Sequence, residues 1–328
     1  MIVRRLATLL ALLLTVGSTR ASECRALIVA GDPGESNSAA ERFTDWATRW
    51  KSALQTKCGF KAENIRMLRS PGKPGDPNPV RPLTPELSTV PAAETATLEN
   101  VKSALATLVK ESRADDQVVL VLIGDGYDSQ GLSKLCLPGK DLTDTDVARE
   151  LDGLKAKLLI CIDTAAASAA FTKTMMGKNR ITITAAATIG QRSQTYFCEF
   201  FLRALETGNT NLLEAFNHAT LETTHFYQNQ FAEKKVTTVH GKDFQALYKK
   251  FYPERELAPG GAEPQKANNN QEVLDGWYGR RVLTEVAGLE DNGDGVPSTI
   301  FEDGKEPAPL PTKDGEGNIA RTVVLGKP

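Results

Sequence analysis

The chain is organised around residues Val118–Gly131, V-V-L-V-L-I-G-D-G-Y-D-S-Q-G. Six apolar residues follow one another without alternation from Val118 to Ile123. Such a run, ended by glycine, is typical of a strand that is covered on both faces and central in a parallel sheet. Gly124 and Gly126 bracket Asp125 just beyond the strand, where open α/β sheets bind their ligands. Asp125 is therefore the first candidate for a functional residue.

Other strands and helices alternate around this central strand. Apolar patterning predicts strands over 25–30, 65–69, 157–163 and 180–187, and helices over 37–58, from the cap Thr97 onward, from about Asp144 and over 195–206. Residues 70–96, rich in Pro, Gly, Ser and Thr, predict a surface loop, and a further loop follows the central strand. The alternation predicts an α/β fold with a mostly parallel sheet and helices on both faces.

The first 21 residues predict a cleaved signal peptide. Arg4-Arg5 precede an apolar run from Leu6 to Val16, and Ala21 closes a small-residue cleavage site before Ser22. The run is shorter than the roughly 20 apolar residues that span a bilayer, although an uncleaved anchor is the alternative. We expect a secreted or periplasmic protein without membrane attachment after cleavage.

The remaining chain divides by composition. Residues 22–230 suit one large α/β domain, 231–270 a mobile insertion, 271–298 a segment that packs back on the domain, and 299–328 a disordered tail. The net charge of −2, the absence of basic clusters and the 6% of aromatic residues argue against a nucleic-acid partner.

Five cysteines lie beyond the signal peptide. A disulfide between Cys24 and Cys58 is predicted, because an oxidising compartment permits it and the two flank the first strand and helix. Cys161 and Cys198 suit buried thiols of the core, and Cys136 lies on a loop. There is no C-x-x-C, and the three histidines are scattered. We expect no cofactor.

Several stretches together resemble the caspase/legumain-like cysteine peptidases (clan CD), especially their secreted bacterial members. That family has G-H-G after the central strand and a C-x-S-G-like turn after the next buried strand. Residues 123–126 and 163–169 occupy these places, with positions 125 and 166 separated by 41 residues, against about 50 in caspases. The resemblance covers 25–230 and 271–298 and implies a caspase-like three-layer sandwich.

Both catalytic positions depart from the family. Asp125 stands at the histidine position, and Ala166 (Ala165 if the register shifts by one) at the cysteine position. An aspartate with an ordinary pKa near 4 is a weak base at neutral pH, and a methyl group cannot attack a carbonyl. Ser168 and Cys136 have no histidine nearby in sequence.

The resemblance therefore predicts a pseudopeptidase. Its vestigial cleft would bind a peptide or protein, with Asp125 favouring basic groups. The cleft residues would be Gly124, Asp125, Gly126, Asp163 and Ser168. A degenerate but active cysteine-type peptidase is the first alternative.

Two groups of carboxylates suggest metal chemistry. Asp32, Asp125, Asp128 and Asp163 all follow predicted strands, as the ligands of a Mg²⁺-dependent phosphoesterase do, although no phosphate-binding motif accompanies them. Asp291, Asn292 and Asp294 resemble half of a calcium loop. That loop lacks its distal glutamate, so simple turn formation is the competing interpretation.

Overall fold

The computed structural model describes residues 21–32, 37–70, 90–186, 195–233, 285–300, 310–311 and 315–328, without the side chains of 37–41 and 227–233. The predicted signal peptide up to residue 20, and the predicted insertion from residue 234 onward, lie outside the described residues. Within the described ranges, none of the helices combines the length and apolar character needed to cross a membrane.

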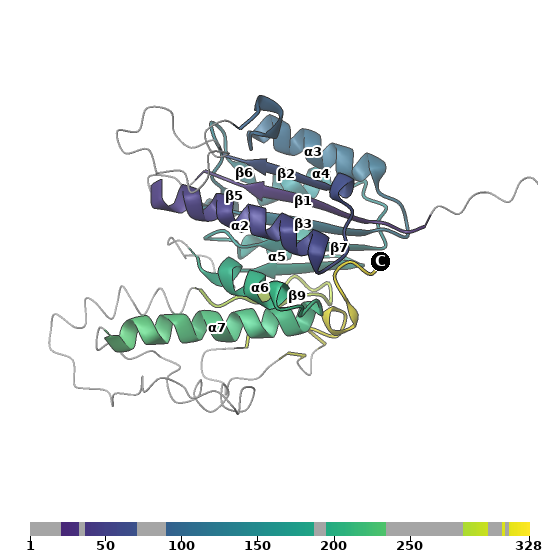
Figure 1. The fold of residues 1–328 in the computed structure, drawn as a ribbon. Coiled ribbons are helices and arrows are strands. Elements are labelled where there is room, and N and C mark those ends of the chain that lie inside the picture. Colours follow the sequence, from purple (N-terminus) through teal and green to yellow (C-terminus); the bar gives the residue numbers. More distant parts are fainter. Residues whose placement is uncertain are drawn as a thin grey trace, which may run out of the picture.

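A six-stranded sheet forms the middle of the molecule (Figure 1). Its order is β2 (Ile65–Arg69), β1 (Cys24–Ala30), β3 (Gln117–Ile123), β7 (Leu158–Asp163), β8 (Arg180–Thr184) and β9 (Gly288–Glu290). The first five strands are parallel, and β9 runs antiparallel to β8 at the edge. All seven residues of β3 are buried, which confirms the prediction of a covered central strand.

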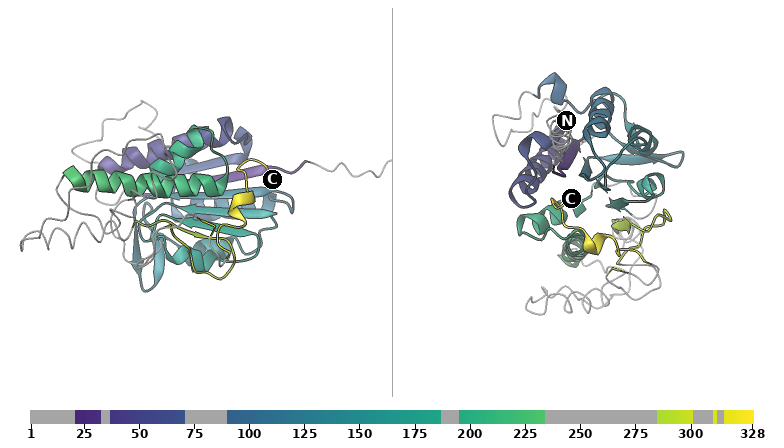
Figure 2. Two further views of the ribbon diagram at one scale, coloured as in Figure 1. Left: turned by 90° about the horizontal axis from the view of Figure 1, so that it is seen from below. Right: turned by 90° about the vertical axis from the view of Figure 1, so that its right-hand side faces the viewer.

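Helices cover both faces of this sheet and complete a three-layer α/β sandwich (Figure 2). On one face α2 (Asn37–Thr56), α6 (Phe197–Glu206) and α7 (Leu212–Glu233) pack against residues such as Val119 and Val121. On the other, α3 (Leu98–Glu111), α4 (Asp144–Glu150) and α5 (Ala170–Met175) pack against residues such as Leu120 and Leu122. Alternate residues of β3 point to opposite faces, so one apolar strand serves both cores.

The start of α3 follows the sequence signal. The Thr97 side chain accepts a hydrogen bond from the backbone N–H of Asn100 at 3.3 Å. This cap satisfies one of the N–H groups that a helix leaves unpaired at its first turn.

The segment after β3, predicted as a loop, contains a small antiparallel sheet. It consists of β4 (Gly126–Ser129), β5 (Leu132–Leu135) and β6 (Leu142–Thr143). Gln130 and Gly131 join β4 to β5 with positive φ angles of 58° and 78°. A two-residue turn with positive φ at both positions matches the twist of the two strands of a hairpin, and glycine adopts a positive φ without steric cost.

The C-terminal segment corrects the prediction of a disordered tail. Ala320, Val323 and Leu325 are buried in the core beside α7 and α2. The Gln117 side chain donates to the Val324 carbonyl at 3.1 Å and accepts from the Gly326 N–H at 2.8 Å. Residues 315–328 therefore pack beside the amino end of β3. Their overall composition is polar, but their few apolar side chains are buried in the core. Of the predicted segment 271–298, residues 271–284 lie outside the described residues. Residues 285–298 pack on the domain, with β9 at the sheet edge.

The predicted disulfide is wrong for this structure. Cys24 and Cys58 are both free thiols, and both are buried. Burial raises the pKa of Cys24 to about 11 and that of Cys58 to about 12, which keeps both thiols protonated at neutral pH. Cys161 and Cys198 are buried thiols, as predicted.

Candidate functional site

The turns that contain positions 125 and 166, where the resemblance expects a catalytic dyad, lie side by side at the carboxyl edge of the sheet. β3 and β7 are adjacent and parallel, so the residues that follow them reach the same edge. Thr164, the residue after β7, is hydrogen-bonded to β3, since its backbone N–H donates to the Leu122 carbonyl at 2.8 Å. A Cβ added to Gly126 would lie 2.3 Å from the carbonyl oxygen of Ala166. The predicted adjacency of these two turns at one sheet edge is confirmed, but the turns pack directly against each other and do not face each other across the predicted cleft.

The turn after β7 is closed rather than open. Ala165, Ala166 and Ser168 are each at most 2% exposed. Ala167 has a φ of 56°, and its carbonyl accepts a hydrogen bond from the Ser133 hydroxyl. The Ser168 hydroxyl accepts the N–H of Ala186 at 3.2 Å. The serine therefore holds the turn against the residues that follow β8 and is not presented as a nucleophile.

Asp125 is the one half-buried member of the predicted cleft set. Its Oδ1 accepts the N–H of Gly126 at 2.9 Å. Burial raises the pKa of Asp125, while the Gly126 hydrogen bond and the charge of Arg42 lower it, and the charge of Asp32 raises it further. Gly124, Gly126, Asp163 and Ser168 are buried, so these four do not line an open groove.

Cys136 lies next to this carboxylate but has the wrong electrostatics for a nucleophile. Its backbone N–H donates to the Asp125 carbonyl at 3.0 Å, and its own carbonyl accepts the N–H of Asp32 at 2.7 Å. Burial, followed by the charges of Asp141, Asp125 and Asp32, raises the pKa of the Cys136 thiol to about 12. A nucleophilic cysteine requires a lowered pKa. His218 and His225 lie on α7, and His240 lies outside the described residues.

Asp163 is buried and holds its proton near neutral pH. Burial raises its pKa to about 8; the hydrogen bond from the Ala165 N–H, at 2.9 Å, lowers the pKa, and the charge of Asp144 raises it. Asp32, Asp125, Asp128 and Asp163 form no metal-binding cluster within the part of the chain that the structure describes. The geometry therefore gives no support to the phosphoesterase interpretation.

An open pocket of about 450 Å³ lies between α2, α6 and α7. Arg42 links it to the carboxyl edge, because its guanidinium packs 4.9 Å from the centre of the Tyr196 ring while its charge acts on Asp125. The sequence analysis missed this pocket, since its residues come from three helices and each helix shows only an ordinary amphipathic pattern. The lining residues are Arg42, Asp45, Trp46, Tyr196, Glu199, Phe200, Arg203, Glu222, His225 and Phe226.

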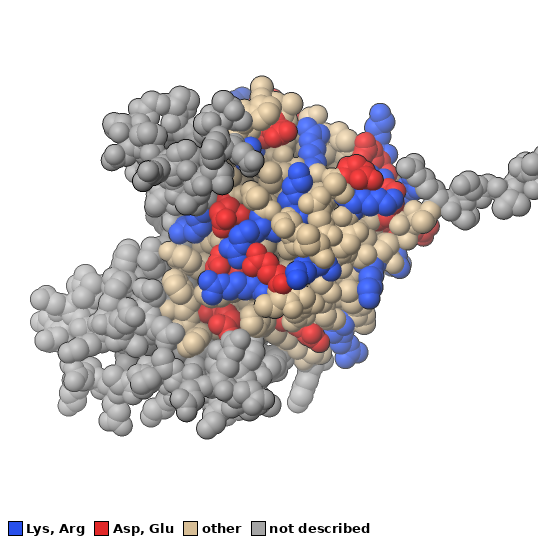
Figure 3. Space-filling view, in the orientation of Figure 1, with Lys and Arg blue, Asp and Glu red and all other residues tan. Residues whose placement is uncertain are grey.

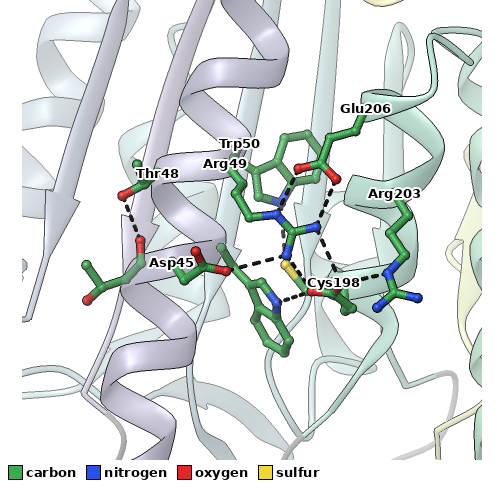
Figure 4. A network of polar contacts seen from close by, with 10 residues as sticks. Asp45, Thr48, Arg49, Trp50, Cys198, Arg203 and Glu206 are labelled. Carbon is green, nitrogen blue, oxygen red and sulfur yellow. Dashed lines mark hydrogen bonds and ion pairs between the residues drawn. The ribbon is translucent and has the colours of Figure 1, made fainter. Parts of the chain in front are cut away.

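A network of charges fastens the helices beside the pocket (Figure 4). Arg49 on α2 contacts Glu206 at 2.8 and 2.9 Å and Glu199 at 2.6 Å, both on α6. Glu199 also accepts from the indole N–H of Trp46 at 2.8 Å and from Arg203 at 2.7 Å. Bidentate pairing of arginine with carboxylates fixes orientation as well as distance. Figure 3 shows charged side chains of both signs gathered in the middle of this face.

The predicted calcium ligands are only partly brought together. Asp291 accepts backbone N–H groups of Gly317, Ile319 and Ala320 at 2.7–2.9 Å, so it anchors the C-terminal segment. Asn292 exchanges hydrogen bonds with Asp294.

Asp294 instead groups with Glu290 and Glu316, and a carboxylate oxygen of each lies within 4.8 Å of the others. Sequence spacing missed both glutamates, because one belongs to the short edge strand β9 and the other to the segment predicted to be disordered.

Comparisons with known proteins find matches among solved structures. No protein-family model and no curated protein matches the chain. Among solved structures, the chain is similar to the crystal structure of protein GSU0716 from Geobacter sulfurreducens, a structural genomics target. The two share 14% sequence identity with a TM-score of 0.40, over 61% of this chain and 88% of that one.

Proposed function

We propose that this protein is an exported, catalytically inactive relative of the caspase/legumain-like peptidases, and that it binds a peptide or protein partner through a basic side chain. The observation that carries the proposal is the close approach of Gly126 to Ala166. It brings together the two turns at which the resemblance expects histidine and cysteine, and at which this chain has Asp125 and Ala166. A carboxylate and a methyl group do not supply a nucleophile with its base.

The neighbouring side chains support the inactive state. The nearest thiol, Cys136, is held protonated by burial and by three carboxylates, with its pKa raised to about 12. Ser168 is buried, and its hydroxyl is engaged with Ala186. Removal of triad members lowers rates by several orders of magnitude, so we expect no measurable peptide cleavage.

The pocket beside Asp125 supports the choice of partner. Four aromatic rings line it, those of Trp46, Tyr196, Phe200 and Phe226. A lysine or arginine side chain gains from contact with ring faces and from nearby carboxylates. The chain's own Arg42, over Trp46 and Tyr196, and Arg203, over Phe200, already make such ring contacts here, so a partner's basic group would have to share these rings. Asp45 and Glu222 in the pocket and Asp125 beside it supply those carboxylates. A volume of about 450 Å³ suits one or two side chains of an extended peptide.

Catalysis is tested with the purified protein against a broad panel of fluorogenic peptides and thiol-directed activity probes. We expect no turnover and no probe labelling, and the same result for Asp125→Ala. Turnover that disappears in Cys136→Ser or in Ser168→Ala would overturn the inactive assignment.

Binding is tested with matched peptides whose central residue is lysine, glutamate or alanine. We expect the lysine series to bind best, and Asp125→Asn combined with Glu222→Gln to weaken it about fivefold, the size of a partly exposed charge interaction. Glu214→Gln is the control, because Glu214 is exposed on the same helix but outside the pocket. Equal affinity for the glutamate series would contradict the proposed partner.

A further inference from the structure

Three carboxylates meet where β9 ends and the C-terminal segment returns to the sheet. Glu290 is the last residue of β9, Asp294 lies in the turn that follows, and Glu316 comes from the C-terminal segment. A carboxylate oxygen from each lies within 4.8 Å of the other two. Glu290 and Glu316 are 0% and 1% exposed, whereas Asp294 is exposed. The cluster is thus buried on two sides and open to solvent on the third.

Glu290 supplies an independent indication of a ligand. The backbone N–H groups of Gly293 and Gly295 stabilise its carboxylate, with Gly293 donating to Oε1 at 2.6 Å. Its Oε2 is buried and has no hydrogen-bond partner of normal geometry among the described residues. A buried carboxylate oxygen without a donor costs free energy unless a positive charge compensates it. Oxygen ligands of this charge and number are those that a hard divalent cation takes in proteins.

The surrounding contacts hold the three carboxylates in place. Asp291 directs its own oxygens toward the C-terminal segment and donates its N–H to Glu316 Oε2 at 2.9 Å. Burial raises the pKa of Glu290, and it raises the pKa of Glu316 to about 8. The charges of neighbouring carboxylates raise both pKa values further. Lys173 of α5 lies close to the turn, since a Cβ on Gly295 would be 3.3 Å from its Cα. A bound cation would relieve the repulsion within this group.

We propose that Glu290, Asp294 and Glu316 form a calcium site that fastens the C-terminal segment to the edge of the sheet. Two oxygens bound to one calcium ion lie at most about 5 Å apart, which accommodates the observed separations without rearrangement. Magnesium gives up its water ligands reluctantly and is seldom held by several protein carboxylates alone, so a site built from three of them suits calcium better. The exposed side admits the ion and its remaining water ligands. This inference is independent of the proposed function at Asp125.

The proposal is tested by calorimetric titration and thermal unfolding of the purified protein after chelation, with calcium or magnesium chloride added. We expect saturable calcium binding with a Kd between about 1 μM and 1 mM, the range of sensor and extracellular sites, and an unfolding temperature that rises with calcium. Glu290→Gln, Glu316→Gln and Asp294→Asn should each weaken binding by at least about tenfold.

Asp144→Asn is the matched control. Asp144 is also buried, and its Oδ1 also has no hydrogen-bond partner in the described part of the chain, but it lies outside the cluster. Its variant should therefore keep the full calcium response. Absence of a calcium response in wild type, a response that persists in Glu290→Gln with Glu316→Gln, or a stronger response to magnesium would overturn the proposal. Should that double variant not fold, the exposed Asp294→Asn decides alone.

Discussion

Gly126 and Ala166 approach each other so closely that no side chain fits between their backbones. A methyl group on Gly126 would lie 2.3 Å from the carbonyl oxygen of Ala166 and 2.8 Å from that of Lys134. The start of the β4–β5 hairpin is therefore packed directly against the turn that follows β7. This contact places Asp125 at its position on the sheet edge, and it requires glycine at position 126.

Gly126→Ala should lower the free energy of unfolding by about 2 kcal/mol, because both close atoms belong to the backbone and cannot move aside cheaply. Gly153→Ala is the control, since an added methyl there meets only the Val109 side chain at an ordinary 3.5 Å. Urea unfolding of both variants measures the difference. Similar stability of the two variants would show that the Gly126 contact is not as tight as described.

Asp163→Asn should flatten the pH dependence of stability. In the folded protein the pKa of Asp163 is raised to about 8 by burial, whereas in the unfolded chain it is about 3.9. The folded state thus binds the proton more tightly, so the stability contribution is complete below about pH 4 and is lost as the pH rises toward 8. Asparagine retains an acceptor for the Ala165 N–H without titrating.

The variant should therefore become more stable relative to wild type as the pH increases across this range. Unfolding in urea at a series of pH values measures the difference. The exposed Asp152→Asn should run parallel to wild type, and parallel curves for Asp163→Asn as well would show that Asp163 ionises normally.

Leu325→Ala should destabilise the protein by about 2–4 kcal/mol, the usual cost of truncating a buried leucine. Leu325 is 1% exposed and belongs to the core that includes α2 and α7. Thermal or urea unfolding measures the loss, with the exposed Arg321→Ala as the control. A loss below about 0.5 kcal/mol would mean that the C-terminal segment does not contribute to the core.

Cys136 should react slowly with iodoacetamide at pH 8, because alkylation needs the thiolate and the pKa of this thiol is about 12. Its rate should rise about tenfold for each added pH unit while the fold persists. Mass spectrometry of the labelled peptide follows the reaction, and the denatured chain provides the fast reference. Labelling of the folded protein as fast as the denatured chain at pH 8 would reveal an activated thiol.

Local sequence patterns determined the central architecture. The unbroken apolar run Val118–Ile123 became the buried β3, and the predicted segment 65–69 became β2 with the same bounds. Thr97 caps α3 as its position indicated. These features depend on residue period and on contacts within a few positions of the chain, so neighbouring residues carry the whole signal. The proximity of the turns at Asp125 and Ala166 also followed, because adjacent parallel strands end at the same edge.

The features that join distant segments of the chain could not be predicted from the sequence. The pocket draws residues from α2, α6 and α7, and the carboxylate cluster joins β9 to Glu316. The polar composition of 315–328 gave no sign that Leu325 is buried. Nothing near Ser168 in sequence indicated that its hydroxyl would accept the N–H of Ala186. Burial and the approach of charges are properties of neighbours in space, and they set the pKa values of Cys136, Asp163 and Glu316. Such neighbours exist only once the chain has folded.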